Sequence, residues 1–429
     1  MKNKGKFTIT KVRGTITNGR VNNKRTAMNP MSTNSITYVN SKSGKTQTQS
    51  YLEMQDLIVP VLVKKDKQTG ELNFAMQYEY VPSSKYGVQI ELPDFAFFDE
   101  KKDNYSEQDV SECIKENLSY LDLKLIGFKY LDSGTTAINQ SITDQIMKVV
   151  YVYVKENKNA DNNLEWFPVS SLHDYLHSKP VGLHAPEYSC MKTKYALRLF
   201  YEKFKNEINK KKQTKFTFRE DLFNRKSPWQ QRKTIMENKY RFGTALVENT
   251  LLEKGISNYG TVFEIGTSRN SVECLITKRE NKKIKIGLSR QQRSPFIARE
   301  GISEFFYEEV GGMVEEGESY EDALKREVPE ETGIPIKNGK LHKMSNPIML
   351  GKGTQESSVF YIYEMKGDEQ HIGQSLDTEE SIEDMEWFDL DKIDLNKLHA
   401  PIPTKYAITL AREYFERNRD DIEHPGFDR

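Results

Sequence analysis

The sequence has few cysteines, no long apolar run and no net charge. Its 429 residues include only three cysteines, Cys113, Cys190 and Cys274, and an odd number of widely spaced cysteines gives neither a disulfide framework nor a zinc knuckle. A membrane-spanning helix needs about 18 consecutive apolar residues, and neither such a run nor an N-terminal secretory signal is present. Lys plus Arg and Asp plus Glu each number 63, which excludes a protein that is basic or acidic throughout. We therefore expect a cytoplasmic protein with no membrane partner.

The chain does contain enough apolar material for more than one core. Hydrophobic residues make up 36% and aromatic residues 11% of the sequence. A single hydrophobic core rarely grows beyond about 250–300 residues, so the length predicts two domains. Strand and helix patterns are intermixed in both halves, which favours an α/β sandwich over a helical bundle.

Charge is unevenly distributed along the chain. Residues 1–50 contain ten Lys or Arg and no Asp or Glu, and residues 201–241 contain 13 Lys or Arg against five Asp or Glu. We interpret the first segment as a basic N-terminal arm, either poorly ordered or an irregular strand pair, and residues 206–249 as a basic linker. Each is either a solvated surface or a site that attracts RNA or another phosphate-bearing partner. Residues 300–389 contain 23 Asp or Glu against seven Lys or Arg, which suggests that this region binds cations.

Short markers recur in the same order slightly over 210 residues apart, which indicates duplication of one domain. The pairs are Gln77 and Gln291, Glu165–Phe167 and Glu386–Phe388, His184–Pro186 and His399–Pro401, and Thr193–Ala196 and Thr404–Ala407. We place the two halves at residues 51–205 and 250–429. Patterns of alternating or β-branched residues predict strands at 57–64, 72–80 and 149–154 in the first half, and at 261–265, 272–277 and 359–363 in the second.

One acidic segment carries most of the chemical information. Residues 312–334 read GMVEEGESYEDALKREVPEETGI. Gly311 and Gly312 permit backbone geometry that would turn a carbonyl toward a ligand. Ser319 is a suitable N-cap and Gly333 a suitable C-terminal glycine, so the spacing predicts a helix between them.

Three glutamates share one face of this predicted helix. Glu327, Glu330 and Glu331 stand at positions i, i+3 and i+4. Clustered carboxylates repel one another unless a cation lies between them, and hard oxygen ligands of this kind suit Mg²⁺ or Mn²⁺. We therefore expect a divalent cation at this helix.

The segment resembles the box of the Nudix hydrolases, Gly-x5-Glu-x7-Arg-Glu-U-x-Glu-Glu-x-Gly-U, and matches it at every specified position. The resemblance implies an α/β/α sandwich around a mixed sheet and metal-dependent cleavage of a nucleoside diphosphate linked to another moiety. The roles that it implies are metal ligation by Glu327, Glu331, Glu330 and Gly311, help or base catalysis by Glu330, and orientation of the helix by Glu318 and Arg326. Pro329 stands in an unrestricted position, where its missing N–H removes a helical hydrogen bond and a local kink is expected.

Residues outside the box resemble those of ADP-ribose pyrophosphatases. Gln291, Arg293 and Pro295 are similar to their Gln-x-Arg-x-Pro segment, and Glu308 precedes Gly312 by four residues, as in their Glu-Leu-Pro-Ala-Gly segment. Here Glu-Val-Gly replaces the middle of that segment. The resemblance implies substrate binding by Arg293, Glu308 and Gly312, and it makes Glu356 a second candidate for the catalytic base.

The first half lacks the box. When residues 109–117 are aligned with the acidic helix, Glu116 alone remains of the key carboxylates, and Ser119 replaces the closing glycine. We predict a degenerate Nudix-like domain at 51–205 and a catalytic one at 250–429, joined as a pseudo-dimer. The chain would then be a monomer of this kind or a homodimer.

The predicted function is Mg²⁺- or Mn²⁺-dependent hydrolysis of ADP-ribose or a related nucleotide sugar or dinucleotide, with release of a nucleoside monophosphate. One alternative is removal of a cap or NAD-type group from the 5′ end of RNA, which the basic segments would bind. The other is a nucleotide-sensing regulator without catalytic activity.

Overall fold

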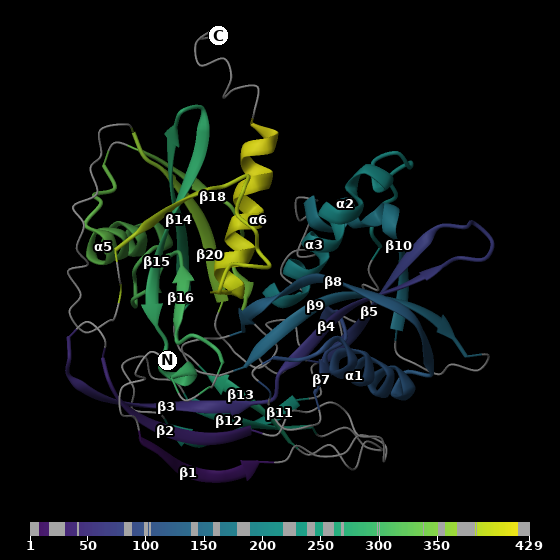
Figure 1. The fold of residues 1–429 in the computed structure, drawn as a ribbon, viewed down its shortest axis with the longest axis horizontal. Helices are drawn as coiled ribbons and strands as arrows, with labels where there is room; N and C mark the ends of the chain where they lie inside the picture. The colour runs from purple at the N-terminus through teal and green to yellow at the C-terminus, as the bar shows by residue number, and fades with distance from the viewer. Residues whose placement is uncertain are drawn as a thin grey trace.

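The computed structural model describes residues 8–16, 31–40, 43–80, 88–97, 102, 104–138, 145–157, 164–177, 189–217, 229–237, 245–251, 261–266, 270–297, 299, 301–337, 339–350, 357–366, 382 and 384–418. Two large mixed sheets with helices on their faces make up most of these residues (Figure 1). The predicted α/β class, with mixed sheets, is confirmed.

The first large sheet belongs to the N-terminal half. Its strands are β4 (Leu57–Lys65), β5 (Leu72–Tyr80), β6 (Val88–Glu91), β7 (Phe95–Ala96), β8 (Leu123–Ala137), β9 (Ile146–Glu156), β10 (Leu164–Pro168) and β22 (Ala400–Pro401). Their order is β10-β5-β4-β9-β8-β22, with β6 paired to β5 and β7 paired to β4. The helices of this half are α1 (Glu107–Tyr120), η1 (Val169–Ser171), α2 (Leu172–His177) and α3 (Met191–Ile208).

The second large sheet repeats this plan. Its strands are β14 (Ser271–Glu280), β15 (Lys283–Gln292), β16 (Phe305–Glu308), β17 (Val310–Met313), β18 (Lys340–Lys343), β19 (Ile348–Met349), β20 (Ser357–Glu364) and β21 (Glu386–Asp389). Their order is β16-β15-β14-β20-β18, with β17, β19 and β21 paired to β14, β20 and β15. The helices are η3 (Ser294–Phe296), α5 (Tyr320–Thr332) and α6 (Ile402–Arg417).

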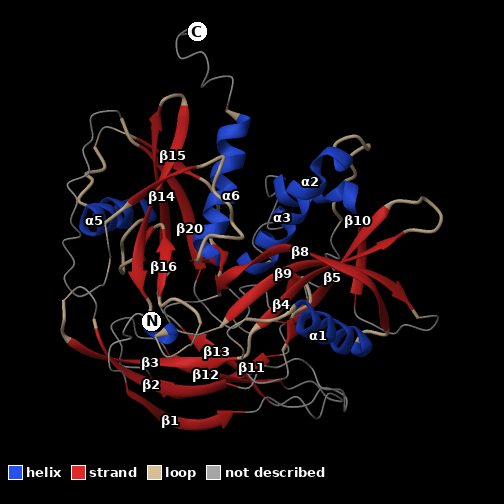
Figure 2. Ribbon diagram, viewed as in Figure 1, coloured by secondary structure: helices blue, strands red, loops and turns tan. Residues whose placement is uncertain are grey.

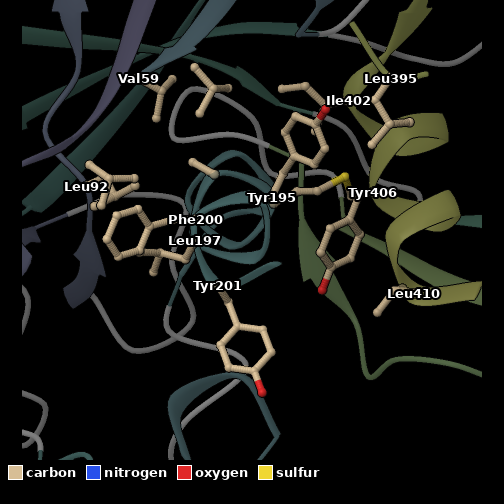
Figure 3. Close-up of a cluster of buried hydrophobic side chains, with 14 of the residues drawn as sticks. Val59, Leu92, Tyr195, Leu197, Phe200, Tyr201, Leu395, Ile402, Tyr406 and Leu410 are labelled. Atoms are coloured by element: carbon tan, nitrogen blue, oxygen red, sulfur yellow. The ribbon is translucent and has the colours of Figure 1, made fainter. Parts of the chain in front are cut away.

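The two halves share a core between α3 and α6. Side chains alternate along β4, so that Val59 and Val61 join this shared core while Ile58 and Leu62 join a separate core beneath α1. Figure 3 shows side chains of α3 in the shared core close to Tyr406 of α6. A third core lies between the second sheet and α5.

The second sheet contains a strand that the sequence did not reveal. Both strands predicted at 261–265 and 272–277 are present, but 261–266 lies in a different sheet, and β14 pairs with β15. Asn281 and Lys282 link β14 to β15 with φ values of 51° and 63°. Such a two-residue hairpin usually contains glycine. Because this turn has no glycine, the sequence did not predict it.

A small antiparallel sheet precedes each large one. Strands β1 (Thr8–Ile16), β2 (Met31–Val39) and β3 (Thr46–Met54) form the first, and β11 (Trp229–Glu237), β12 (Ala245–Leu251) and β13 (Thr261–Gly266) form the second. Both lie at the bottom of the view in Figure 2. Strands β1 to β3 include residues of the predicted basic arm, and β11 and β12 include residues of the predicted basic linker, so each half consists of a small sheet followed by a large one.

Several contacts cross between the halves. Strand β22 follows the second sheet in the sequence but pairs in parallel with β8 of the first. Nζ of Lys405 donates to Oδ2 of Asp132 at 2.9 Å, and Nη1 of Arg299 donates to Oδ1 of Asp56 at 2.9 Å. All four of these charged residues are buried. In the described part of the chain, no helix is both long and apolar enough to span a membrane.

Candidate active site

Helix α5 carries the acidic cluster and has the ends that the sequence predicts. At its start, Oγ of Ser319 accepts a hydrogen bond from the backbone N–H of Asp322 at 3.1 Å. At its end, Gly333 has a φ of 70° and donates its N–H to the carbonyl of Pro329 at 2.8 Å. The helix continues through Pro329 to Thr332, so the acidic residues remain on one helical element.

Arg326 joins the helix to the loop before it. Its Nε–H and Nη2–H donate to the two carboxylate oxygens of Glu318 at 3.1 and 3.0 Å, and Nη2–H also donates to the carbonyl of Met313 at 2.9 Å. Nη1–H donates to Glu327. The hydrogen bonds from Arg326 lower the pKa of Glu318, so Glu318 holds the arginine as a carboxylate at neutral pH.

The side chain of Glu327 lies directly against the backbone of Gly312. A Cβ atom added to Gly312 would lie 2.0 Å from Cδ and 2.1 Å from Oε1 of Glu327. These separations are far below van der Waals contact, so only glycine leaves room for the carboxylate at this point of β17. The structure thus brings together Gly312, Glu318, Arg326 and Glu327.

A second carboxylate, Glu273 of β14, lies against the neighbouring glycine. A Cβ atom added to Gly311 would lie 2.0 Å from Oε2 of Glu273. Oγ of Ser271 and Oγ of Ser358 donate to Oε1 of Glu273 at 3.0 and 3.2 Å. The sequence analysis missed this residue, although a lone carboxylate within the run Ser271–Ile276 was a usable signal.

The glycine pair therefore has a carboxylate on each side. Val272 and Cys274 belong to the core under α5, and side chains alternate along a strand, so Glu273 faces away from α5. Glu327 approaches from α5 itself. Glycines at both positions allow the two acidic side chains to approach the backbone of β17 from opposite faces of the sheet.

The remaining predicted carboxylates of the box differ in exposure. The side chain of Glu330 is 52% exposed, and its Oε2 lies 3.8 Å from Nη1 of Arg326. Glu331 is half-buried. Glu356, the alternative base, lies outside the described residues. Of these three, Glu330 is thus the one seen to be open to solvent.

Arg293 and Glu308 form a close pair beside the box. Nε–H of Arg293 donates to Oε1 of Glu308 at 2.8 Å, and Nη2–H donates to the other oxygen. Glu308 is buried, whereas the side chain of Arg293 remains 20% exposed. Gly312 is the fourth residue after Glu308, so their Cα atoms lie within about 14 Å of each other. The two predicted substrate-binding residues therefore lie together near the acidic helix.

Glu309 is a further buried acid that the sequence analysis missed. Both of its carboxylate oxygens lack a hydrogen-bond partner among the described residues. Burial is the main reason that the pKa of Glu309 is raised to about 7; the charge of Glu308 acts in the same direction, while the hydroxyl of Thr404 and the charge of Arg293 act to lower it. The doublet Glu308–Glu309 before two glycines was the available signal.

The residues at the glycine pair fit a divalent cation in their chemistry. Among the described residues, no three His, Cys, Asp or Glu side chains are already arranged around one point as a metal site would require. The donors near Gly312 are nevertheless carboxylate and carbonyl oxygens, which Mg²⁺ and Mn²⁺ prefer. Gly312 leaves space that a side chain would otherwise occupy, beside the carboxylate of Glu327.

Helix α1 takes the place of α5 on the first sheet but lacks its chemistry. Both helices begin with a serine N-cap whose hydroxyl accepts from an aspartate three residues later. On the face of α1 that packs on the sheet, Sγ of Cys113 and Nδ2 of Asn117 donate to the carbonyl of Ala96 at 3.4 and 3.3 Å. Counted from the two N-caps, Ile114, Asn117 and Leu118 of α1 stand where α5 has Glu327, Glu330 and Glu331.

The space beside α1 is also filled. Phe95 of β7 pairs with Ile58 of β4, as Gly312 of β17 pairs with Val272 of β14. Phe95 is only 2% exposed. A buried phenyl ring therefore stands at the position where Gly312 leaves room for Glu327.

Comparison with known proteins gives a family for the second half. Residues 267–408 match the family model described as NUDIX domain. No curated protein matches the chain.

Two solved structures show weak likeness. One is the NUDIX domain of NrtR from Shewanella oneidensis in complex with ADP ribose. It is 19% identical in sequence, the match spans 34% of this chain and 86% of that domain's chain, and the TM-score is 0.26. A structure of an ADP compounds hydrolase is 16% identical, covers 44% of this chain and 94% of its own, and has a TM-score of 0.30. Likeness at this level does not transfer the ligands of those proteins to this chain.

Proposed function

We propose that the chain, whose residues 267–408 match the family model described as NUDIX domain, hydrolyses the diphosphate bond of a nucleoside diphosphate linked to another moiety. The observation that carries the proposal is the placement of Glu327. Its carboxylate lies against Gly312, while Arg326 bridges it to Glu318. A carboxylate held in this way is preorganised before any ligand arrives.

ADP-ribose is the substrate that we propose first. This substrate is supported by Gln291, Arg293, Pro295 and Glu308, which resemble the corresponding residues of ADP-ribose pyrophosphatases. A guanidinium whose orientation is fixed by a carboxylate can bind a phosphate oxygen by exchanging its partner. A related nucleotide sugar or dinucleotide would present the same diphosphate to Arg293.

Glu327 and Glu331, with Glu330 and the carbonyl of Gly311, are the residues that would hold Mg²⁺ or Mn²⁺. When bound, such an ion neutralises the charge of a diphosphate and acidifies water. The side chain of Glu330 is exposed, which supports a place for it on the solvent side of the three glutamates of α5.

In the proposed reaction, water attacks one phosphorus of the diphosphate. A bond forms between the water oxygen and phosphorus, the bond from that phosphorus to the bridging oxygen breaks, and the water proton passes to a carboxylate. Hydrolysis of ADP-ribose would give AMP and ribose 5-phosphate. Glu330 is one candidate for the base and Glu356 is the other, and a positioned base contributes about 10²–10⁴ in rate.

We assign no catalysis to the first half. Ile114, Asn117 and Leu118 cannot replace the carboxylates of α5, and Phe95 fills the position of Gly312. The shared core and the exchanged strand β22 support a pseudo-dimer with one site. On this proposal the domains are a degenerate half and a catalytic half, each with its small sheet.

The decisive test is the change Glu331→Gln, which keeps the shape of the side chain but removes its charge. We expect the variant to lose nearly all release of AMP from ADP-ribose in the presence of Mg²⁺ or Mn²⁺, because a cation ligand is lost. Its far-ultraviolet circular dichroism should remain that of the wild type. Product analysis by chromatography measures the effect.

Glu321→Gln is the matched control, since Glu321 is an exposed glutamate of the same helix outside the cluster. It should keep full activity. If Glu331→Gln were as active as this control, Glu331 would have no part in the reaction. A panel with NADH, FAD, dinucleoside polyphosphates and capped RNA would separate the proposed substrate class from RNA processing, and the absence of turnover on every substrate would indicate a sensor.

A further inference from the structure

We propose that the first half positions the substrate-binding Arg293 through a buried ion pair between Asp56 and Arg299. This inference rests on the proposed function, in which Arg293 binds a phosphate. It gives the degenerate half a defined task in the reaction at the other site. Asp56 and Arg299 act through Arg293 and do not themselves contact substrate.

Asp56 is a fully occupied acceptor at the start of β4. It is 1% exposed. Its Oδ1 accepts from Nη1 of Arg299 and from the backbone N–H of Ile146, both at 2.9 Å. Its Oδ2 accepts from the hydroxyl of Tyr105 at 2.8 Å and from Nη2 of Arg299. Two donors of the first half, the N–H of Ile146 and the hydroxyl of Tyr105, thus fix the carboxylate that receives an arginine of the second half.

Arg299 is held as firmly as its partner. Its side chain is 6% exposed, and Nη2 also donates to the carbonyl of Lys102 in the first half at 3.2 Å. Two parallel N–H donors directed at one carboxylate define both the position and the orientation of the guanidinium. Because the pair is shielded from water, salt screens it much less than a surface pair.

A short chain of backbone hydrogen bonds connects Arg299 to Arg293. The N–H of Arg299 donates to the carbonyl of Phe296 at 3.1 Å, and the N–H of Phe296 donates to the carbonyl of Arg293 at 3.0 Å. The N–H of Arg293 donates in turn to the carbonyl of Glu304 at 2.7 Å. The two arginines therefore lie at opposite ends of one tight turn, so a shift at Arg299 reaches Arg293.

Apolar packing fixes the same turn to the first half. Phe296, Ile302 and Phe306 form a buried cluster with Ala137 of β8 and Ile146 of β9. Ile146 is also the residue whose N–H binds Asp56. The small sheet contributes as well, because β2 and β3 contact η3.

The chain offers a matched control for Asp56. Asp132 is also a 1% exposed aspartate of the first half. It accepts from a cation of the second half, Lys405, at 2.9 Å and from the hydroxyl of Tyr195 at 2.8 Å. Its hydrogen-bond partners among the described residues, Gly134, Thr136, Tyr195 and Lys405, all lie outside the turn from Arg293 to Arg299. Loss of either aspartate weakens the contact between the halves, but only loss of Asp56 frees the turn.

The experiment compares Asp56→Asn, Arg299→Lys and Asp132→Asn in the full chain. We expect Asp56→Asn to raise the KM for ADP-ribose about tenfold, which corresponds to about 1.4 kcal/mol, with kcat within about threefold of wild type. The KM of Arg299→Lys should lie between that of the wild type and that of Asp56→Asn, because lysine keeps the charge but not the paired geometry. Asp132→Asn should leave KM unchanged.

Hydrogen exchange of the backbone amides in the turn gives a readout that does not depend on turnover. Exchange at Arg293, Phe296 and Arg299 should become about tenfold faster in Asp56→Asn and stay unchanged in Asp132→Asn. Equal exchange and equal KM in the two asparagine variants would overturn the inference. If the wild type hydrolysed no substrate, the proposed function would fail, while the exchange comparison would still decide whether Asp56 positions the turn. If Asp56→Asn did not fold, the exchange of Arg299→Lys against Asp132→Asn would decide it.

Discussion

The substitution Gly312→Ala tests the site by displacing one carboxylate without removing any charged group. In the structure, the added Cβ would lie 2.0 Å from Cδ, 2.1 Å from Oε1 and 2.5 Å from Cγ of Glu327, whereas ordinary contact begins at 3.4 Å. Relief of the clash at Cδ thus needs a movement of 3.4 minus 2.0, or about 1.4 Å. The atoms that must move belong to the side chain of Glu327 and not to the backbone.

We expect this movement to abolish most activity and to leave the fold intact. Misplacement of a reacting group by about 1 Å costs on the order of 10²-fold in rate, so kcat for ADP-ribose should fall by about that factor. Overpacking costs about 1–3 kcal/mol in stability, and the flexible end of Glu327 places this change at the lower end. Steady-state kinetics and urea unfolding would measure the two quantities.

Gly287→Ala provides the control for the clash itself. Its added Cβ would lie 2.1 Å from Sδ of Met385 in the same half, and methionine is an adaptable side chain. This variant should show a similar loss of stability and a normal kcat. A Gly312→Ala enzyme that kept kcat within threefold of Gly287→Ala would refute the role assigned to the position of Glu327.

Two further predictions follow from the charges of the described residues. Glu318→Gln removes the ionic partner of Arg326 and leaves the arginine bound to the carbonyl of Met313 and to Glu327. We therefore expect kcat to fall about tenfold with little change in KM. A fall in kcat accompanied by an equal rise in KM would contradict an orienting role. His399 concerns stability: burial lowers its pKa to about 4, so the folded state favours the neutral ring, and stability present above pH 6.5 is lost as the pH falls toward 4. Urea unfolding should show a loss of at most about 2 kcal/mol between pH 6.5 and pH 5 that His399→Gln lacks, and an equal slope in both proteins would exclude His399 as the cause.

Elements whose determinants are local were predictable from the sequence. The N-cap at Ser319, the left-handed glycine at Gly333 and the helix between them follow from residues only a few positions apart. Strand β5 also has its predicted bounds, because its pattern of side chains is continuous. The resemblance implied that Glu318 and Arg326 orient the helix, and the structure shows these two side chains in an ion pair.

Elements whose determinants are distant in the sequence were not predictable in this way. The strand at 283–292 was missed because its turn adopts positive φ at Asn281 and Lys282 without glycine. Glu273 approaches the site only because β14 pairs with β17 in a register that places it at Gly311. Pairing of this kind depends on which strands meet, and a single strand's sequence does not state its partner.

By itself, the sequence determined the chemistry of this protein: a helix with three carboxylates on one face, an arginine to orient it and glycines that admit a close approach. The tertiary structure alone decided how the two halves cooperate. The exchange of β22 and the pairing of Asp56 with Arg299 join residues more than 200 positions apart. A charged side chain that is buried needs a partner to compensate for the water it loses. That partner can come from any segment that folds against it, so no local sequence pattern predicts it.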